Sequence, residues 1–289
     1  MDIQHLIGLA INGSMFLIVF ALGLQANWSE ATYLFRRPGL FARSLVAMNL
    51  VMAVVAILIC LVFDPAPAIK VSLVALSLSP VPPILPGRQE QAGGSASYVI
   101  GLLAGASIAS IIIVPLGMTI VGAIIGIPLH LHAINIASVV FVSVLLPLLA
   151  GIAIHTVAPA LALRVAKPLS ILAAILLVVA VIPVLIYAFP TLWSLVGNGL
   201  LIGLLCFTII GLLVGHWLGG PNPDDRTVLA LAASSRHPGV AIAVANLAFP
   251  NVDSVLVIVL AHLLLSAIIA TPYVRWRTKE HAATHSEAT

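Results

Sequence analysis

The chain has 289 residues, of which 62% are hydrophobic and only 7% are charged, and its formal net charge at pH 7 is +3. Soluble domains carry about 25% charged residues, so this composition excludes a soluble globular protein and predicts an all-α polytopic membrane protein. The basic residues are spread over short loops, a distribution that argues against a nucleic-acid partner.

Nine spans of roughly 20 or more mostly apolar residues are expected, each long enough to cross a bilayer. In chain order they cover residues 4–26, 39–63, 67–104, 107–128, 133–157, 167–189, 193–218, 226–249 and 252–274. The third and the eighth span are interrupted by polar and helix-breaking residues. The chain becomes polar after residue 278, and we expect residues 279–289 to form a disordered cytoplasmic tail.

The loop charges predict the orientation. With the N-terminus outside, nine Lys and Arg residues fall on the inner side and only Lys70 falls in an outer loop. Inner loops of membrane proteins are enriched in Lys and Arg, so the C-terminus is expected in the cytoplasm, with the protein in a bacterial inner membrane. The nine residues are Arg36, Arg37, Arg43, Arg164, Lys167, Arg226, Arg275, Arg277 and Lys279.

The two breaks, Pro80–Glu90 and Ser234–Gly239, each contain a Pro-Gly pair and an arginine. In lipid an unpaired backbone N–H or C=O costs several kcal/mol, so a broken helix persists only where it lines a cavity walled by protein. Two broken helices at corresponding positions of two halves are typical of a transporter whose substrate binds near the middle of the membrane. Halves of four and five spans indicate an inverted repeat that lacks one leading helix.

Arg88 and Arg236 lie in the breaks, near Gly93 and Gly239, where half-helices are expected to begin. A helix N-terminus has unpaired N–H groups and a partial positive charge, so two such ends with two guanidinium groups form a site for a carboxylate or sulfonate. The alternatives are that Arg236 only bridges carbonyls freed by the break, and that Arg88 pairs with Glu90 or extends to the surface.

Further polar residues near the breaks are candidates for the same site. Ser95, Ser97 and Ser235 can cap half-helices or contact substrate. Glu90 and His237 are candidates for carrying a coupling proton, because a buried carboxyl group and an imidazole can titrate near neutral pH. The alternatives are an ion pair for the glutamate and a hydrogen bond from the histidine to unwound backbone.

No metal site is expected. His130 and His132 share a loop but have no third ligand beside them. His262 lies in an apolar span and is interpreted as structural. Asp224 and Asp225 are interpreted as a solvated turn at the start of a helix.

Several stretches resemble the bile acid/sodium symporter family. Phe-Ala-Leu-Gly-Leu-Gln at 20–25, followed by Phe-Arg-Arg-Pro at 35–38, is similar to the family's first marked segment. Gly-Gly-Ser-Ala-Ser at 93–97 is similar to the signature that opens the second half of the first broken helix, and the run at 238–245 is similar to the one that resumes the second broken helix. The order and spacing of these stretches extend the resemblance over almost the whole chain.

This resemblance implies one transmembrane transporter domain over residues 1–278, with nine of the family's ten helices. It implies a core domain, at about 39–128 and 193–276, in which the broken helices cross, and a panel domain, at about 4–26 and 133–189. It also implies transport of small organic anions, such as bile acids, driven by sodium.

The sequence departs from the family at positions that the resemblance implies for sodium binding. An Asn, a Glu and two Gln of the family are replaced, whereas two serines match sodium ligands, one of them only if a gap is allowed. The replaced positions are Tyr98, Ala232, Arg236 and Asn49, and the matched ones are Ser97 and Ser110.

A sodium site without its carboxylate and beside a guanidinium is electrostatically poor, because two like charges ~4 Å apart repel by a few kcal/mol at an effective dielectric constant near 20. We therefore predict that Arg236 takes the place of a sodium ion and that transport needs neither sodium nor a cofactor. Arginine keeps its proton, so it carries no coupling itself.

The function expected from the sequence is secondary active transport of a small organic anion by alternating access, and no enzyme motif is present. One competing function is that of a sodium symporter with rearranged ligands, built from Ser97, Ser110 and Asn49. A second is that of an intramembrane enzyme that uses Glu90 and His237, and a third is that of a transporter-like sensor that never alternates.

Overall fold

A computed structural model describes residues 3–127, 132–194, 199–250 and 252–286. Within these ranges the chain forms helices and no strand, which confirms the expected all-α class. Seven helices of this part are long and apolar enough to cross a membrane, and two shorter apolar helices cover Leu9–Gly23 and Pro67–Leu78. His130, considered above as a metal ligand, lies outside the described residues.

The helices alternate with short loops and with three irregular turns. In chain order they are α1 (Ile3–Gly23), α2 (Trp28–Ala31), η1 (Leu34–Arg36), α3 (Pro38–Leu45), η2 (Val46–Val51), α4 (Met52–Phe63), α5 (Pro67–Leu78), α6 (Leu85–Gln91), α7 (Ala96–Ile124), α8 (Ala133–Val140), η3 (Phe141–Leu145), α9 (Leu146–Val157), α10 (Pro159–Ser194), α11 (Leu200–Leu218), α12 (Pro223–Ser234), α13 (Pro238–Ala248) and α14 (Asp253–Ser286).

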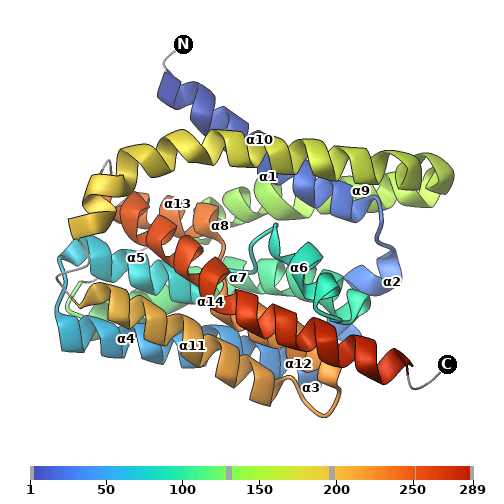
Figure 1. Ribbon diagram of the computed structural model, residues 1–289. Helices are drawn as coiled ribbons and strands as arrows, with labels where there is room; N and C mark the ends of the chain where they lie inside the picture. Colours follow the sequence, from blue (N-terminus) through green and yellow to red (C-terminus); the bar gives the residue numbers. More distant parts are fainter. Residues whose placement is uncertain (1–2, 128–131, 195–198, 251, 287–289) are drawn as a thin grey trace.

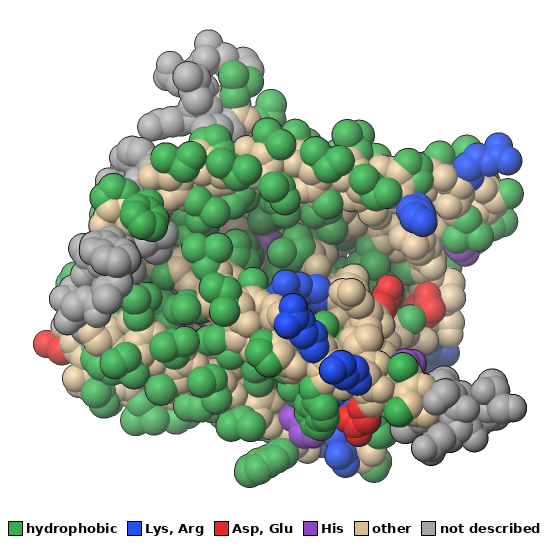
Figure 2. Space-filling model, in the orientation of Figure 1, with side chains coloured by type: hydrophobic (Ala, Val, Ile, Leu, Met, Phe, Trp, Pro, Cys, Tyr) green, Lys and Arg blue, Asp and Glu red, His purple; other side chains and the backbone are tan. Residues whose placement is uncertain are grey.

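Helices α1, α9 and α10 form a separate layer at the top of Figure 1, which we call the upper layer. α1 packs along both α9 and α10, whereas most other helices pack among themselves below. A hollow between the upper layer and the rest is visible in Figure 2. In the same view Lys and Arg side chains occupy the middle and the right, and the left is almost entirely apolar. We call the right-hand end the basic end.

Both predicted breaks are present. Residues 79–84 separate α5 from α6, and residues 235–237 separate α12 from α13. The extent of the first break differs from the prediction, because residues 85–91 form the short helix α6. Pro86 stands in the first turn of α6, where its missing N–H leaves no helical bond unmade.

The prediction of separate spans at 67–104 and 107–128 is wrong, because α7 is one continuous helix of 29 residues. Gly93 has a φ of +80°, a left-handed conformation that suits glycine and reverses the chain between α6 and α7. The Gly-Gly-Ser stretch therefore starts a new helix and does not resume the broken one.

α11 and α12 pack at very short range, and two glycines of α11 make this possible. A Cβ atom on Gly211 would lie 2.6 Å from the carbonyl oxygen of Ala233, and one on Gly215 would lie 2.4 Å from that of Leu229. Small residues allow such backbone contact between membrane helices. This contact fixes the C-terminal end of α12, from which the second break departs.

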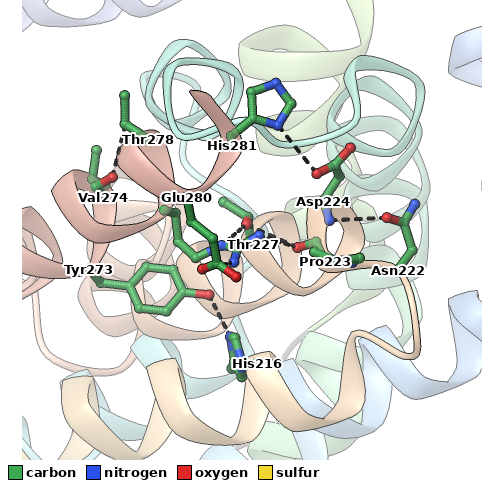
Figure 3. A network of polar contacts seen from close by, with 11 residues as sticks. His216, Asn222, Pro223, Asp224, Thr227, Tyr273, Val274, Thr278, Glu280 and His281 are labelled. Carbon is green, nitrogen blue, oxygen red and sulfur yellow. Dashed lines mark hydrogen bonds and ion pairs between the residues drawn. The ribbon is translucent and has the colours of Figure 1, made fainter. Parts of the chain in front are cut away.

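α14 continues through Ser286, so the expected disorder from residue 279 is wrong for residues 279–286, while residues 287–289 lie outside the described part. Figure 3 shows how polar contacts hold this end of α14 to its neighbours: the hydroxyl of Tyr273 meets Nδ1 of His216 on α11 at 2.8 Å. The guanidinium of Arg277 donates to the hydroxyl of Thr227 on α12 at 2.7 Å. These contacts explain why a polar segment is ordered.

Asp224 and Asp225 begin α12 as predicted, and the side chain of Asn222 caps the helix by accepting from the N–H of Asp224 at 3.1 Å. The interpretation of both carboxylates as solvated is wrong for Asp225, which is only 6% exposed. The carboxylate is buried because the turn between α11 and α12 folds back onto α3.

Candidate functional site

The two unwound segments contact each other directly. The N–H of His237 donates to the carbonyl of Pro80 at 3.0 Å. Nδ1 of the same histidine accepts from the N–H of Val240 at 3.3 Å, so the imidazole caps α13. His237 therefore uses both its backbone and its ring to hold the second break, which agrees with the structural interpretation of this residue.

Arg236 fills the space beside this contact and is only 2% exposed. Its guanidinium donates to the carbonyl of Ser79 at 3.3 Å, to that of Ala233 at 3.3 Å, and to that of Met48. All three acceptors are backbone oxygens. The guanidinium thus joins the first break, the end of α12 and the middle of the span formed by α3, η2 and α4.

The position of the guanidinium follows helix electrostatics. Ser79 follows α5 and Ala233 lies in the last turn of α12, so both oxygens belong to C-terminal ends, which carry a partial negative charge. Met48 lies in the π-helical turn η2, a local distortion often found at functional sites. Arg236 therefore contacts C-terminal ends, whereas the sequence pattern predicts a place beside an N-terminal end.

Arg88 does not join this cluster. Arg88 and Glu90 are both exposed on α6, and the ion pairs of the described residues do not connect them. The expected anion site made by Arg88 together with Arg236 is not assembled in this conformation, because one guanidinium faces outward and the other is enclosed.

The serines assigned to a sodium site are far apart. Ser97 and Ser110 lie on the same continuous helix, α7. At 1.5 Å of rise per residue they are separated by about 20 Å along the axis, so the two hydroxyls cannot bind one ion. Ser110 donates to the carbonyl of Ser107 at 2.6 Å, and the hydroxyl of Tyr98 meets that of Ser44 at 2.8 Å.

The remaining predicted residues are divided between two places. Ser95, like Ser97, lies at the start of α7, away from the unwound segments. Ser235 lies within the second break, next to Arg236, and is buried. Ala232 is buried near the end of α12 and offers no side-chain oxygen. Asn49 follows Met48, and its Oδ1 is buried without a hydrogen-bond partner.

Two hollows lie between the upper layer and the breaks. The first, which we call the apolar hollow, has a volume of about 400 Å³. It is lined by α1, α10, α14 and both breaks, including Asn12, Pro82 and Gly239. The second, which we call the polar hollow, has a volume of about 590 Å³ and includes Gln25, Glu90, Lys167 and Ser170. Both share Pro83, Ile84 and Leu177, so they adjoin at the first break.

Sequence reasoning misses some of these residues. Lys167 has the pattern of a plain loop charge, yet it lines the polar hollow with Gln25. His262 lies close enough to Arg236 to feel its charge, and its ring meets Phe207 edge-on with centroids 5.3 Å apart. The carbonyl of Met48 carries no side-chain signal, so only the unusual π-turn reveals it.

Comparison with known families adds one match. The model of a family described as Sodium Bile acid symporter family matches residues 14–189, which is more than half of the chain. The matched part contains α1 from Ser14 onward, the first break and α7, and it ends before α11. No curated protein matches the chain.

Proposed function

The chain belongs to the Sodium Bile acid symporter family, and from this premise we propose that it is a secondary transporter of a small organic anion that works without sodium. The family is one of membrane transporters, and the apolar helices agree with that class. The finer proposal concerns the driving ion, and it depends on the position of Arg236.

The observation that carries the proposal is the set of three backbone carbonyls around the guanidinium of Arg236. Carbonyl oxygens at helix C-terminal ends are ligands that a monovalent cation would use. Arginine remains charged at any physiological pH, so its side chain supplies that positive charge permanently. A sodium ion beside it would meet electrostatic repulsion and would find Ala232 where the resemblance implies a carboxylate.

We propose that the substrate binds between the upper layer and the breaks. The apolar hollow suits the hydrocarbon part of an organic anion, because its lining is mostly aliphatic. The polar hollow offers the ammonium group of Lys167, the amide of Gln25 and the hydroxyl of Ser170 to a carboxylate or sulfonate. In this proposal Lys167 takes the anion-binding role that the sequence pattern assigns to Arg88.

The architectural proposal keeps nine crossings, made of the seven long helices, α1, and the α5–α6 pair. The upper layer, α1, α9 and α10, corresponds to the proposed panel domain, and the remaining long helices correspond to the core domain. Alternating access then consists of rocking of these two bodies about the crossing, with inverted-repeat halves, the N-terminus outside and the C-terminus in the cytoplasm.

For coupling we propose a proton carried by Glu90. This carboxyl group lines the polar hollow, where it can exchange protons with water and meet the substrate. His237 is a weaker candidate, because its Nδ1 is engaged in capping α13.

A thermal-shift screen of small organic anions on the purified protein tests the proposal. A ligand that binds the native state raises its apparent stability. We expect carboxylates or sulfonates with apolar bodies to raise Tm equally in sodium and in potassium buffer. Stabilisation that appears only in sodium would refute sodium independence, and stabilisation by cations or neutral solutes alone would refute the anion.

A further inference from the structure

A third cavity lies at the basic end, where the start of α3 meets the turn between α11 and α12. Its volume is about 360 Å³, and it shares no lining residue with the apolar or the polar hollow. Arg37 and Arg43 line one side, and Asn222 and Asp225 line the other. We call this cavity the arginine pocket. Nothing in the proposed transport cycle uses it.

The two arginines have donors to spare. Both are exposed, and neither takes part in the ion pairs of the described residues. The guanidinium of Arg37 stacks over the ring of Tyr33, with its carbon 4.4 Å from the ring centroid. Arg43 donates through Nε to the carbonyl of Gly39 at 3.3 Å. These contacts orient each side chain and leave the terminal nitrogens of Arg43 free for an incoming acceptor.

The pocket stays positive in spite of Asp225. Its carboxylate is buried, with Oδ1 lacking a hydrogen-bond partner, and it lies within range of the charges of Arg37 and Arg43. Arg226 is held at the rim, where Nε donates to the carbonyl of Gly220 at 2.6 Å. Three guanidinium groups therefore face one carboxylate, which leaves room for a monoanion such as a phosphodiester.

Apolar stripes lead from the pocket along the surface. On the helix formed by α3, η2 and α4, Val46 and Leu50 are exposed one and two turns beyond Arg43, and Leu50 is 62% exposed. On the neighbouring α11, Leu213 and Trp217 are exposed, and Trp217 is 81% exposed. A tryptophan at this level is typical of the boundary between hydrocarbon and headgroups. A soluble phosphate would make no use of these side chains, whereas acyl chains would cover them.

We propose that the arginine pocket binds the headgroup of an anionic phospholipid from the leaflet at the basic end. Arg37 and Arg43 bind the phosphate, and the acyl chains lie along the stripes of Val46, Leu50, Leu213 and Trp217. Basic pockets between membrane helices on the cytoplasmic side favour anionic headgroups in general. Because α3 and the α11–α12 turn both contact this lipid, it joins two segments that connect to the crossing.

Native mass spectrometry of the full chain in detergent tests the proposal, with phosphatidylglycerol as the probe and phosphatidylcholine as the reference lipid. We expect preferential retention of phosphatidylglycerol by the wild type. The double variant Arg37→Gln/Arg43→Gln should weaken this retention by about 30-fold, the scale expected for two basic residues near an anionic headgroup. The matched control is Arg164→Gln, an exposed arginine of α10 at the same end, which should retain the lipid.

The remaining arms make the result decisive. Asp225→Asn removes the opposing charge, so it should strengthen retention of phosphatidylglycerol while leaving phosphatidylcholine unchanged. Equal retention of the two lipids by the wild type, or equal loss in the double variant and in Arg164→Gln, would overturn the proposal. Displacement of phosphatidylglycerol by millimolar inorganic phosphate would overturn it too, by assigning the pocket to a soluble anion.

Discussion

The N–H of His237 donates to the carbonyl of Pro80 at 3.0 Å, which makes one hydrogen bond the direct link between two breaks that lie in opposite halves of the chain. Arg236 and Ser79, the neighbours of these two residues, are linked as well, through the guanidinium and a carbonyl. Two backbones that are unwound inside an apolar protein therefore satisfy part of each other's polar groups, and a buried cation satisfies the rest.

Replacement of Arg236 by Ala should destabilise the fold severely. The change leaves the carbonyls of Met48, Ser79 and Ala233 without their donor. At ~1–3 kcal/mol for each unsatisfied buried group, the expected loss is several kcal/mol. Thermal unfolding of the purified variant in lipid nanodiscs measures this loss. Arg88→Ala, which removes an exposed guanidinium, serves as the control and should change stability by no more than about 0.5 kcal/mol. Equal stability of both variants would contradict the bridging role of Arg236.

Leu177→Trp should block uptake without unfolding the protein. Leu177 lines both the apolar and the polar hollow, so a larger side chain fills the path between them. Leu172→Trp on the same helix is the matched control, because Leu172 is 58% exposed on the lipid-facing surface. Uptake of the anion identified by the thermal-shift screen is measured in proteoliposomes. Full activity of Leu177→Trp would show that the substrate takes another route.

Gly215→Ala should loosen the contact between α11 and α12. The added methyl group would lie 2.4 Å from the carbonyl oxygen of Leu229, which neither backbone can vacate without a shift of the whole helix. We expect a loss of about 1–3 kcal/mol, read as a lower Tm and reduced expression. A Cβ atom on Gly13 meets nothing within 4 Å, so Gly13→Ala should be neutral or slightly stabilising. A neutral result for both would mean that the helices are farther apart than described.

Glu90→Gln should abolish stimulation of uptake by an inwardly directed proton gradient. Gln keeps the size of the side chain in the polar hollow but cannot bind and release a proton. His237→Asn should retain the stimulation, because Asn also caps a helix N-terminus and so replaces the hydrogen bond to Val240. The comparison uses proteoliposomes with matched protein content and equal internal pH. Loss of stimulation in His237→Asn alone would move the proton to the histidine.

Sequence patterns locate the long spans and both breaks because each signal is local. Twenty apolar residues predict a crossing wherever the neighbours lie, and Pro-Gly pairs end a helix without help from tertiary structure. The same reasoning fails at residues 85–124. The polarity of Arg88, Gln89 and Glu90 predicts an unwound segment, although all three favour helices and form α6. The two glycines before α7 then suggest a resumed half-helix where a new helix begins.

The site could be predicted only in part. An arginine inside an apolar break is a strong signal, and Arg236 is indeed enclosed at the crossing. Its partners leave no trace in the sequence, because any residue supplies a backbone carbonyl and only the fold decides which carbonyls converge. The separation of Ser97 from Ser110 likewise depends on the continuity of α7, which a single misplaced helix boundary conceals.

Binding of radioactive ²²Na⁺ to the purified wild-type protein tests the central claim most directly, and it requires no knowledge of the substrate. If the guanidinium of Arg236 occupies the place of the cation, bound radioactivity should stay at the level seen with excess unlabelled sodium, from low to high millimolar Na⁺. Saturable ²²Na⁺ binding that unlabelled sodium displaces and potassium does not would contradict the account.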